Sequence, residues 1–314
     1  MGGYMLYFIV NEKSKSGNAK QIWKEIEEVL KVRNVSYQAF VSEYRGHAGK
    51  LAAEICAMDD NDICLVAVGG DGTANEVING ITDFEKVRFG VIPTGSGNDF
   101  ARGLSLSKDP KNGAIHILNA MKKSREDTWC MDLGEVNFGE KKRLFAISAG
   151  IGLDALVCKK ALKSTIKDIL NKIRLGKLTY LVLTVQSLFT MQTADAEIFF
   201  DREEGLQKKR MIFTAAMNFK AEGGGVPMAP AASACDGKLS FCEAAGIPKW
   251  RTFLCLPFLV AAKHTSIHGF SVTDAKDCTI RLSRPMVVHA DGEYCGEVTE
   301  VHFHCLPGKL RVLK

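Results

Sequence analysis

Several patterns that would place the chain in a common class are missing from its sequence. No uninterrupted apolar stretch reaches the length of about eighteen residues that a membrane-spanning helix needs, so no transmembrane segment is expected. The first residues carry no charged region ahead of the apolar ones, so no secretory signal is expected either. No G-x-x-x-x-G-K-[ST] motif occurs, which argues against a P-loop. The dinucleotide pattern G-x-G-x-x-G would need glycine where Asn75 stands, which disfavours hydride transfer.

Cysteine is plentiful but has no metal-binding pattern. The ten cysteines include no C-x-x-C pair, and they lie mostly among apolar residues. This favours reduced, buried thiols in a cytoplasmic protein over a zinc site. The net charge of +5 is mildly basic. It suits nucleotide phosphates or an anionic membrane surface and does not require nucleic acid.

The length of 314 residues favours two domains, because single cores rarely grow that large. Up to about residue 126, strand-like runs alternate with helical patterns, which predicts an α/β domain with a mostly parallel, doubly wound sheet. Its predicted strands are 5–10, 37–41, 63–68 and 88–92, and its helices are 19–32, 48–58, 74–80 and 112–122. From 127 to 305, short strands with turns between them predict a β-rich, antiparallel second domain. Residues from about 306 to 314 are expected to return to the first domain.

Two apolar helical stretches interrupt the second domain, at 155–190 and 248–268, and lysine and arginine flank both of them. Core packing with solvated charged faces is the favoured account of these stretches. A cleft for acyl chains, with a basic rim that meets anionic headgroups, is the second account, and both can hold at once.

The stretch 63–76, ICLVAVGGDGTANE, is the most informative in the chain. An unbroken apolar run, typical of a strand buried on both faces, ends in three glycines and an acid ahead of a helical segment. Glycines there let backbone N–H groups approach a ligand, and the following helix directs its positive end at the same place, so the turn predicts phosphate binding. A carboxylate beside phosphate repels it unless a cation or proton lies between them. The candidate residues are Gly69, Gly70, Asp71, Gly72, Thr73 and Asn75.

Three further loops follow predicted strands at the same sheet edge. Residues 89–102 repeat the sequence of strand, glycine-rich turn and helix start. The loop 11–18 could offer donors to phosphate, although a polar surface turn explains it as well. Ser42 could contact a nucleotide or simply cap a helix. Together the four loops predict a nucleotide site more strongly than any one of them, with Asn11, Ser16, Gly17, Ser42, Ser96, Gly97 and Asn98 as candidate contacts.

The second half contains two acidic candidates. In the long loop 218–238, Asp236 could ligate a cation together with backbone carbonyls, although Asp-Gly is also a common turn. Asp291 and Glu293 follow the predicted strand 286–290. They could act as a general base with a supporting acid or as a metal-ligand pair, although a hairpin turn would use the same residues.

Four motifs in order resemble the diacylglycerol kinase catalytic-domain superfamily, and in particular its bacterial soluble lipid kinases, which are related to sphingosine and ceramide kinases. They are GGDGT at 69–73, GSGNDFA at 95–101, GGG at 223–225 with Asp236-Gly237, and Asp291-Gly292-Glu293. The resemblance covers essentially the whole chain. It departs from the family pattern at Glu12, which replaces a proline, and at Cys235, which replaces a frequent aspartate.

The resemblance implies transfer of a phosphoryl group from ATP to a lipid hydroxyl. It implies an α/β nucleotide domain (1–126 with about 306–314) and a β-sandwich-like lipid domain (127–305). ATP would contact the four loops, and Mg²⁺ would be positioned by Asp71. A second metal site would use Ser233, Asp236 and Lys238, and the pair Asp291 and Glu293 would abstract the proton. A lipid presented at a membrane surface, with the protein cytoplasmic and peripherally attached, is the expected partner.

Two other functions share part of this pattern. An NAD kinase has the Gly-Gly-Asp-Gly turn, but the motif at 95–101 and the apolar helices argue against it. A regulatory module that binds nucleotide or lipid without catalysis is disfavoured by the presence of both Asp71 and the later acid pair. The residues name no particular lipid, although diacylglycerol or a similar lipid is favoured, and they leave a homodimer open.

Overall fold

The computed structural model describes residues 5–14, 19–95, 97–163, 176–201 and 204–314. The chain divides into two compact units. The N-terminal unit is Met1–Met131 with Gly308–Lys314, and the C-terminal unit is Asp132–Pro307. Two strands, β5 (Trp129–Phe138) and β14 (Glu293–Val312), run through the boundaries between the units.

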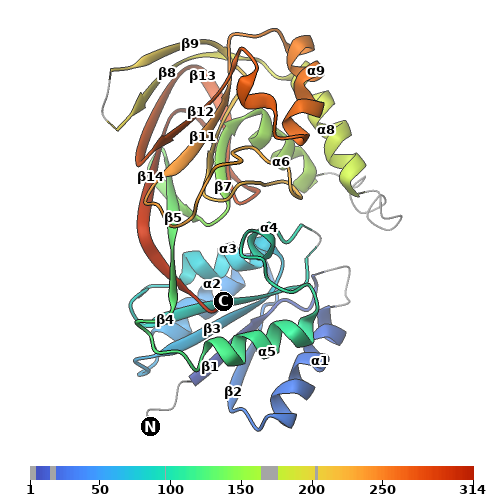
Figure 1. Ribbon diagram of the computed structural model, residues 1–314, viewed down its shortest axis with the longest axis vertical. Coiled ribbons are helices and arrows are strands. Elements are labelled where there is room, and N and C mark those ends of the chain that lie inside the picture. Colours follow the sequence, from blue (N-terminus) through green and yellow to red (C-terminus); the bar gives the residue numbers. More distant parts are fainter. Residues whose placement is uncertain (1–4, 15–18, 96, 164–175, 202–203) are drawn as a thin grey trace. The chain divides into compact units, whose positions relative to one another are not determined.

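The N-terminal unit alternates strands and helices (Figure 1). Its strands pair in parallel in the order β14–β4–β3–β1–β2, with only the last residues of β14 taking part. This confirms the predicted doubly wound parallel sheet. The elements are β1 (Met5–Val10), α1 (Ala19–Val32), β2 (Tyr37–Val41), α2 (His47–Cys56), β3 (Ile63–Gly69), α3 (Asp71–Gly80), β4 (Val87–Pro93), α4 (Asp99–Gly103) and α5 (Pro110–Ala120).

Burial explains why these segments form the sheet. Every residue of β3 and β4 is buried, as expected for strands covered on both faces. The apolar residues of α1 recur at helical spacing and pack with α5 on one face of the sheet. Helices α2 and α3 contact each other and cover the other face (Figure 1).

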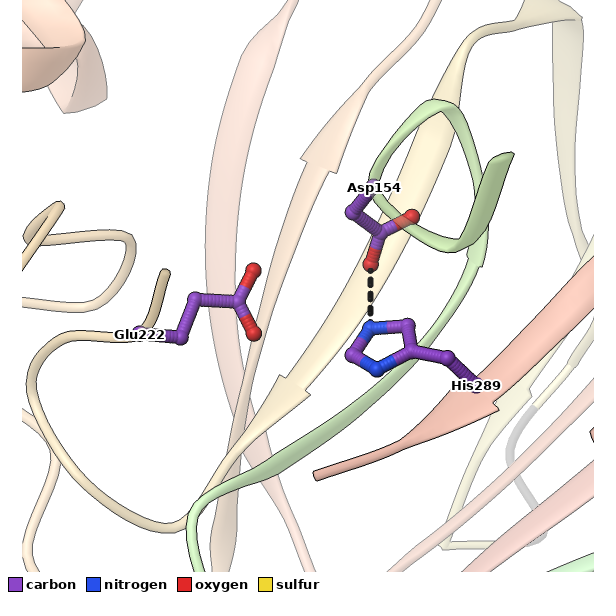
Figure 2. Close-up of side chains that lie close together, drawn as sticks. All are labelled: Asp154, Glu222 and His289. Carbon is purple, nitrogen blue, oxygen red and sulfur yellow. Dashed lines mark hydrogen bonds and ion pairs between the residues drawn. The ribbon is translucent and has the colours of Figure 1, made fainter. Parts of the chain in front are cut away.

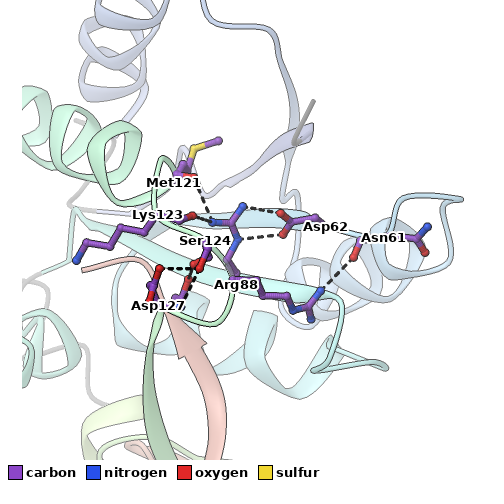
Figure 3. A network of polar contacts seen from close by, with 9 residues as sticks. Asn61, Asp62, Arg88, Met121, Lys123, Ser124 and Asp127 are labelled. Carbon is purple, nitrogen blue, oxygen red and sulfur yellow. Dashed lines mark hydrogen bonds and ion pairs between the residues drawn. The ribbon is translucent and has the colours of Figure 1, made fainter. Parts of the chain in front are cut away.

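A fully buried charged side chain lies inside this unit. Arg88, on β4, has a fully buried side chain and binds the Asp62 carboxylate through two hydrogen bonds of 2.9 and 2.7 Å. Its remaining nitrogen, Nη1, donates to the carbonyls of Met121 and Lys123 at 3.2 and 3.1 Å (Figure 3). The guanidinium therefore joins the start of β3 to the segment that follows α5.

The start of α3 differs from the prediction. The helix was expected at 74–80, with the acid in the preceding loop, but it begins at Asp71. Gly70 is extended, with φ −93° and ψ −174°, and occupies the N-cap position. Asp71 therefore lies in the first turn of a helix, where a negative charge is favoured by the helix dipole.

The C-terminal unit is antiparallel and β-rich, which confirms the predicted class. Its main sheet has the order β12–β11–β10–β7–β13–β14, with β8 and β9 added on β13 and β6 paired with β5. Its further elements are β6 (Lys141–Phe145), β7 (Ser148–Gly152), α6 (Leu153–Lys163), α8 (Gly176–Thr190), β8 (Ala194–Phe200), β9 (Leu206–Met211), β10 (Phe213–Met217), β11 (Leu239–Ala244), α9 (Lys249–Val260), the 3₁₀ helix His264–Ser266, β12 (Phe270–Ala275) and β13 (Asp277–Ala290).

Strand β13 joins two parts of this unit. The predicted strand 286–290 is the second half of this longer strand, which has a register shift between Arg281 and Met286. Pro285 lies in the shift, where a missing N–H is tolerated. The first half pairs with β8 and the second half with β7, so the strand bends from one pairing to the other.

One of the two predicted apolar helical stretches is shorter than expected. The stretch 248–268 forms α9 only as far as Val260, followed by a short 3₁₀ helix. The stretch 155–190 contains α6 and α8, and its residues 164–175 lie outside the described part of the chain. Among the described residues, no helix has the length and apolar character to cross a membrane.

Candidate functional site

The predicted nucleotide loops meet at one edge of the N-terminal sheet. Because β1, β2, β3 and β4 are parallel, their carboxyl ends lie at the same edge. Asn11, after β1, donates from Nδ2 to Thr73 Oγ1 in α3 at 3.0 Å. Ser14 and Thr94 share a hydroxyl–hydroxyl hydrogen bond of 2.6 Å. The loops after β1, β3 and β4 are thus held together by their own side chains.

The position of these loops suits a ligand. The chain leaves β1 toward α1 on one face of the sheet and leaves β3 toward α3 on the other face. Neighbouring strands whose connections diverge in this way open a crevice at the carboxyl edge, where open α/β sheets bind ligands. Ser42, at the end of β2, lies beside it, with its N–H donating to the Val10 carbonyl at 2.8 Å.

Glycines allow the turns after β3 and β4 to touch. A Cβ on Gly95 would lie 2.7 Å from Gly70 Cα and 2.9 Å from Asn98 Oδ1. A side chain at Gly95 would therefore separate the two turns. Asn98 closes the second turn, since its Oδ1 accepts from Gly95 N and its Nδ2 donates to the Gly95 carbonyl, both at 2.9 Å.

Asp71 joins the two turns. Its carboxylate oxygens accept the backbone N–H groups of Asp99 at 3.1 Å and Phe100 at 3.0 Å, which begin α4. A carboxylate oxygen can accept more than one contact, so these hydrogen bonds are compatible with a role as a cation ligand. Asp71 therefore supports the geometry of the predicted nucleotide loops as well as being a candidate metal ligand.

The other predicted contacts of this unit are placed as follows. Gly97 lies against Asp71, because a Cβ there would be 3.0 Å from Asp71 Oδ2. Asn75 is buried in α3, where its side-chain oxygen and its carbonyl both accept from Asn79 Nδ2. Asn75 thus has structural partners within its own helix. Ser16, Gly17 and Ser96 lie outside the described residues.

The acid pair of the C-terminal unit lies on a tight hairpin between β13 and β14. Asp291 and Gly292 form a two-residue turn in which both have positive φ, 47° and 80°, as a type I′ turn requires. Asp291 Oδ1 accepts the N–H groups of Ile147 and Ser148 at 2.8 and 3.1 Å, and Oδ2 accepts that of Ala146 at 2.9 Å. Asp291 thus anchors the turn that presents Glu293.

A second group beside this turn was missed by the sequence analysis. Asp154 from the first turn of α6, Glu222 from the long loop and His289 from β13 bring their polar atoms within 4.8 Å of one another (Figure 2). His289 Nε2 already binds Asp154 Oδ2 at 3.0 Å, and the Ser148 hydroxyl donates to Glu222. No local motif marks these residues, since they are separated by about seventy positions from one to the next along the chain.

The carboxylates around His289 affect the pKa of its imidazole. Burial alone would lower the pKa of the imidazole. The hydrogen bond to Asp154 and the charges of Asp154, Glu222 and Asp291 outweigh this effect, so the pKa is raised above its usual value.

The predicted second metal site lies in the long loop. Ser233, Asp236 and Lys238 are all exposed there, and Asp236 Oδ1 accepts the N–H of Lys238 at 3.1 Å, which is the turn that Asp-Gly favours. A second carboxylate, Asp132, is buried against this loop and accepts the N–H of Gly237 at 2.7 Å. Two carboxylates with loop carbonyls are the donor type that hard cations use. The assignment stays a prediction, and Asp132 is the residue that the sequence analysis did not include.

Known proteins resemble the chain along nearly its whole length. A model of the diacylglycerol kinase catalytic domain matches residues 5–131, and a model of the YegS C-terminal NAD kinase beta sandwich-like domain matches residues 148–314. "Putative lipid kinase YtlR" of Bacillus subtilis (strain 168) is 30% identical over 311 residues, which are 98% of each protein. Diacylglycerol kinase of the same strain is 28% identical over 251 residues, covering 78% of this chain and 75% of that protein.

A solved structure shares the fold. The crystal structure of "a putative diacylglycerol kinase from Bacillus anthracis str. Sterne" matches with a TM-score of 0.77 at 22% identity, covering 98% of this chain and 96% of the other. The two matched domain models and the two-unit fold agree on one family. The chain belongs to the diacylglycerol kinase catalytic-domain superfamily of bacterial lipid kinases.

Proposed function

We propose that the protein is an ATP-dependent lipid kinase that transfers the γ-phosphoryl group to a lipid hydroxyl, with diacylglycerol or a similar lipid as the acceptor. The observation that carries this proposal is the joined set of loops after β1, β3 and β4 in a chain that belongs to this superfamily. Phosphoryl transfer depends mostly on positioning and charge neutralisation, which glycine turns and a cation-binding acid supply.

The N-terminal unit would hold the nucleotide. Glycines at the ends of β3 and β4 let the two turns approach each other closely, and the ten-residue helix α3 directs its positive end at the same edge. Asn11 and Thr73 lie at that edge, joined by a hydrogen bond. Mg²⁺, when bound, would neutralise developing negative charge on the phosphates, and Asp71 is the residue proposed to help hold it.

The C-terminal unit would supply proton abstraction. Asp291 and Glu293 lie on the type I′ turn, and one of them accepts the proton of the lipid hydroxyl as the phosphoryl group is transferred. Because Asp291 also anchors the turn through three backbone N–H groups, its replacement would disturb the backbone as well as the chemistry. Glu293 is therefore the cleaner position for a test.

The lipid would be taken from a membrane surface. Helices α8 and α9 contact each other, with the rings of Phe189 and Phe253 6.0 Å apart between centroids. They expose large apolar side chains, and exposed Arg251 and Lys263 lie on and just after α9. Apolar side chains with neighbouring cations suit insertion among anionic lipids. The apolar residues are Leu181, Val182, Phe189, Trp250, Phe253, Leu254, Phe258 and Val260.

The proposal is tested by incubating the protein with labelled ATP and Mg²⁺. The acceptors are diacylglycerol, phosphatidylglycerol and a sphingoid base in phosphatidylglycerol vesicles, and NAD in a separate reaction. We expect label in a lipid, with diacylglycerol favoured. Label in NAD alone would support the NAD kinase alternative, whose beta sandwich the description of the matched C-terminal domain model names. No transfer to any acceptor would support a non-catalytic binding protein.

Changing Glu293 to glutamine is expected to lower kcat for lipid phosphorylation by about 10²–10⁴-fold, the usual contribution of general acid–base catalysis. The KM for ATP should stay unchanged, because the substitution lies outside the nucleotide loops. Glu300→Gln on the same strand is the matched control, since Glu300 is exposed and binds only Arg281 in the contacts described. Full activity of Glu293→Gln, with Asp291→Asn inactive and folded, would assign the proton to Asp291 instead.

Changing Leu254 to glutamate is expected to weaken binding to phosphatidylglycerol vesicles about tenfold or more, because it removes an inserting apolar side chain and adds a repelled charge. Leu254 is 57% exposed, so folding should not suffer. Val32→Glu, at an 87% exposed position in the other unit, is the control. Vesicle sedimentation measures the effect. Equal binding of the two variants would show that α9 does not contact the membrane.

A further inference from the structure

His289 is a buried titratable residue that has no assigned role in the proposed phosphoryl transfer. Its side chain is only 2% exposed, and it lies two residues before Asp291 at the end of β13. Both ring nitrogens have partners. Nε2 lies 3.0 Å from Asp154 Oδ2, and Nδ1 accepts the backbone N–H of Gly292 at 3.3 Å. The ring therefore bridges α6 and the turn that carries the acid pair.

These partners determine the tautomer. The Gly292 N–H is a donor, so Nδ1 must be the unprotonated nitrogen of the neutral ring. Nε2 then carries the hydrogen and donates it to Asp154. Asp154 fixes the orientation of the ring, and the ring in turn fixes Gly292. Figure 2 shows the ring of His289 aligned with the Asp154 carboxylate, with Glu222 at its side.

We propose that His289 is a positioning residue for the Asp291–Glu293 turn, holding the Gly292 N–H through Nδ1 while Asp154 anchors Nε2. This inference rests on the proposed function, because the proposed function gives the turn its role in phosphoryl transfer. A type I′ turn with a non-glycine residue at positive φ is a conformation that the surroundings must stabilise. Three backbone N–H groups donate to the Asp291 carboxylate and hold one side of the turn, and His289 holds the Gly292 side.

The charged groups that face the ring are Asp154 from α6, Glu222 from the long loop and Asp291 from the turn. The positive charge of a protonated ring would be attracted to these carboxylates. It would also place an Nδ1–H against the Gly292 N–H, and two donors cannot bond. The Gly292 contact therefore exists only with the neutral ring.

Two amide substitutions test the contacts of the two ring nitrogens separately. Asparagine can place an oxygen near the position of Nδ1, so His289→Asn keeps an acceptor for Gly292 and loses the contact with Asp154. Glutamine can place its NH₂ near the position of Nε2, so His289→Gln keeps the contact with Asp154 and leaves Gly292 without its acceptor. We expect kcat within about threefold of the wild type for His289→Asn and about tenfold or more lower for His289→Gln, with the KM for ATP unchanged in both.

Hydrogen exchange at the Gly292 amide, measured by NMR, gives a readout that does not depend on activity. Exchange should be slow in the wild type and in His289→Asn, and at least several-fold faster in His289→Gln. Equal exchange in the wild type and His289→Gln overturns the proposed contact. Equal loss of kcat in both variants, with their exchange different, overturns its role in catalysis. If the wild type transfers phosphate to no lipid, the proposed function fails, while the exchange data still decide whether His289 holds the turn.

A third variant covers the case in which His289→Gln does not fold. Asp154→Asn keeps an acceptor for Nε2–H and removes one of the charges that favour the protonated ring. Its kcat above neutral pH should match the wild type, while the acid limb of its kcat–pH profile should move to lower pH. An unmoved limb would contradict the proposed link between the ring and the turn.

Discussion

Alanine in place of Asp71 is expected to lower kcat/KM for ATP-dependent phosphorylation by about 10²–10³-fold. The substitution removes a charged acceptor from the N–H groups of Asp99 and Phe100, at 3.1 and 3.0 Å. Hydrogen bonds to charged groups contribute about 1.5–3 kcal/mol each, and two of them reach this range. The turns after β3 and β4 would then separate, whether or not a cation is also lost.

An aspartate with the same local role elsewhere provides the control. Asp109 caps α5 by accepting the N–H of Asn112 at 2.8 Å. Asp109→Ala should cost about 1 kcal/mol of stability and leave the KM for ATP unchanged. Steady-state kinetics with varied ATP and Mg²⁺ separates the two variants. Wild-type kinetics in Asp71→Ala would exclude both the structural and the cation-binding role of this residue.

Methionine in place of Arg88 is expected to lower the free energy of unfolding of the N-terminal unit by roughly 3 kcal/mol, a value typical of breaking a buried ion pair. The Arg88 side chain is fully buried, and the change leaves Asp62 and the carbonyls of Met121 and Lys123 without their donor. Asp62 is 33% exposed, so water can partly replace the lost contact. Urea unfolding of both proteins measures the difference.

Arg311→Met is the matched control for this substitution. Arg311 binds Glu85 at 3.0 Å, but the Glu85 side chain is 80% exposed. A surface ion pair of this kind contributes about 1 kcal/mol or less. Equal losses of stability in the two variants would show that burial of Arg88 has no special energetic role.

The fold of the N-terminal unit could be predicted because its pattern is local. Unbroken apolar runs such as 63–68 are typical of strands covered on both faces, and alternation with amphipathic helices such as 19–32 favours a parallel sheet. The boundary of α3 could not be predicted, because it depends on the extended conformation of Gly70. The bend of β13 at Pro285 was missed for a similar reason, since its two halves pair with different strands.

The candidate sites were only partly accessible from the sequence. Asp71 and Asp291 stand next to glycines in short motifs, and that spacing marked them. His289, Asp154 and Glu222 are ordinary residues in their own segments, and only the packing of β13, α6 and the long loop brings them together. Asp132 lies beside the 233–238 loop for the same reason. It accepts the N–H of Gly237, which is 105 positions away in the sequence.

The sequence by itself determined the family, the two fold classes and the presence of glycine turns and acids, because these follow from composition, periodicity and short motifs. Only the tertiary structure decided what the acids bind. In the structure, the Asp71 carboxylate accepts backbone N–H groups at the start of α4, and the Asp291 carboxylate accepts those just before β7. His289 lies between Asp154 and Gly292 and binds both. Hydrogen bonds between distant segments form only when the chain packs, so the spacing of residues along the sequence does not predict them.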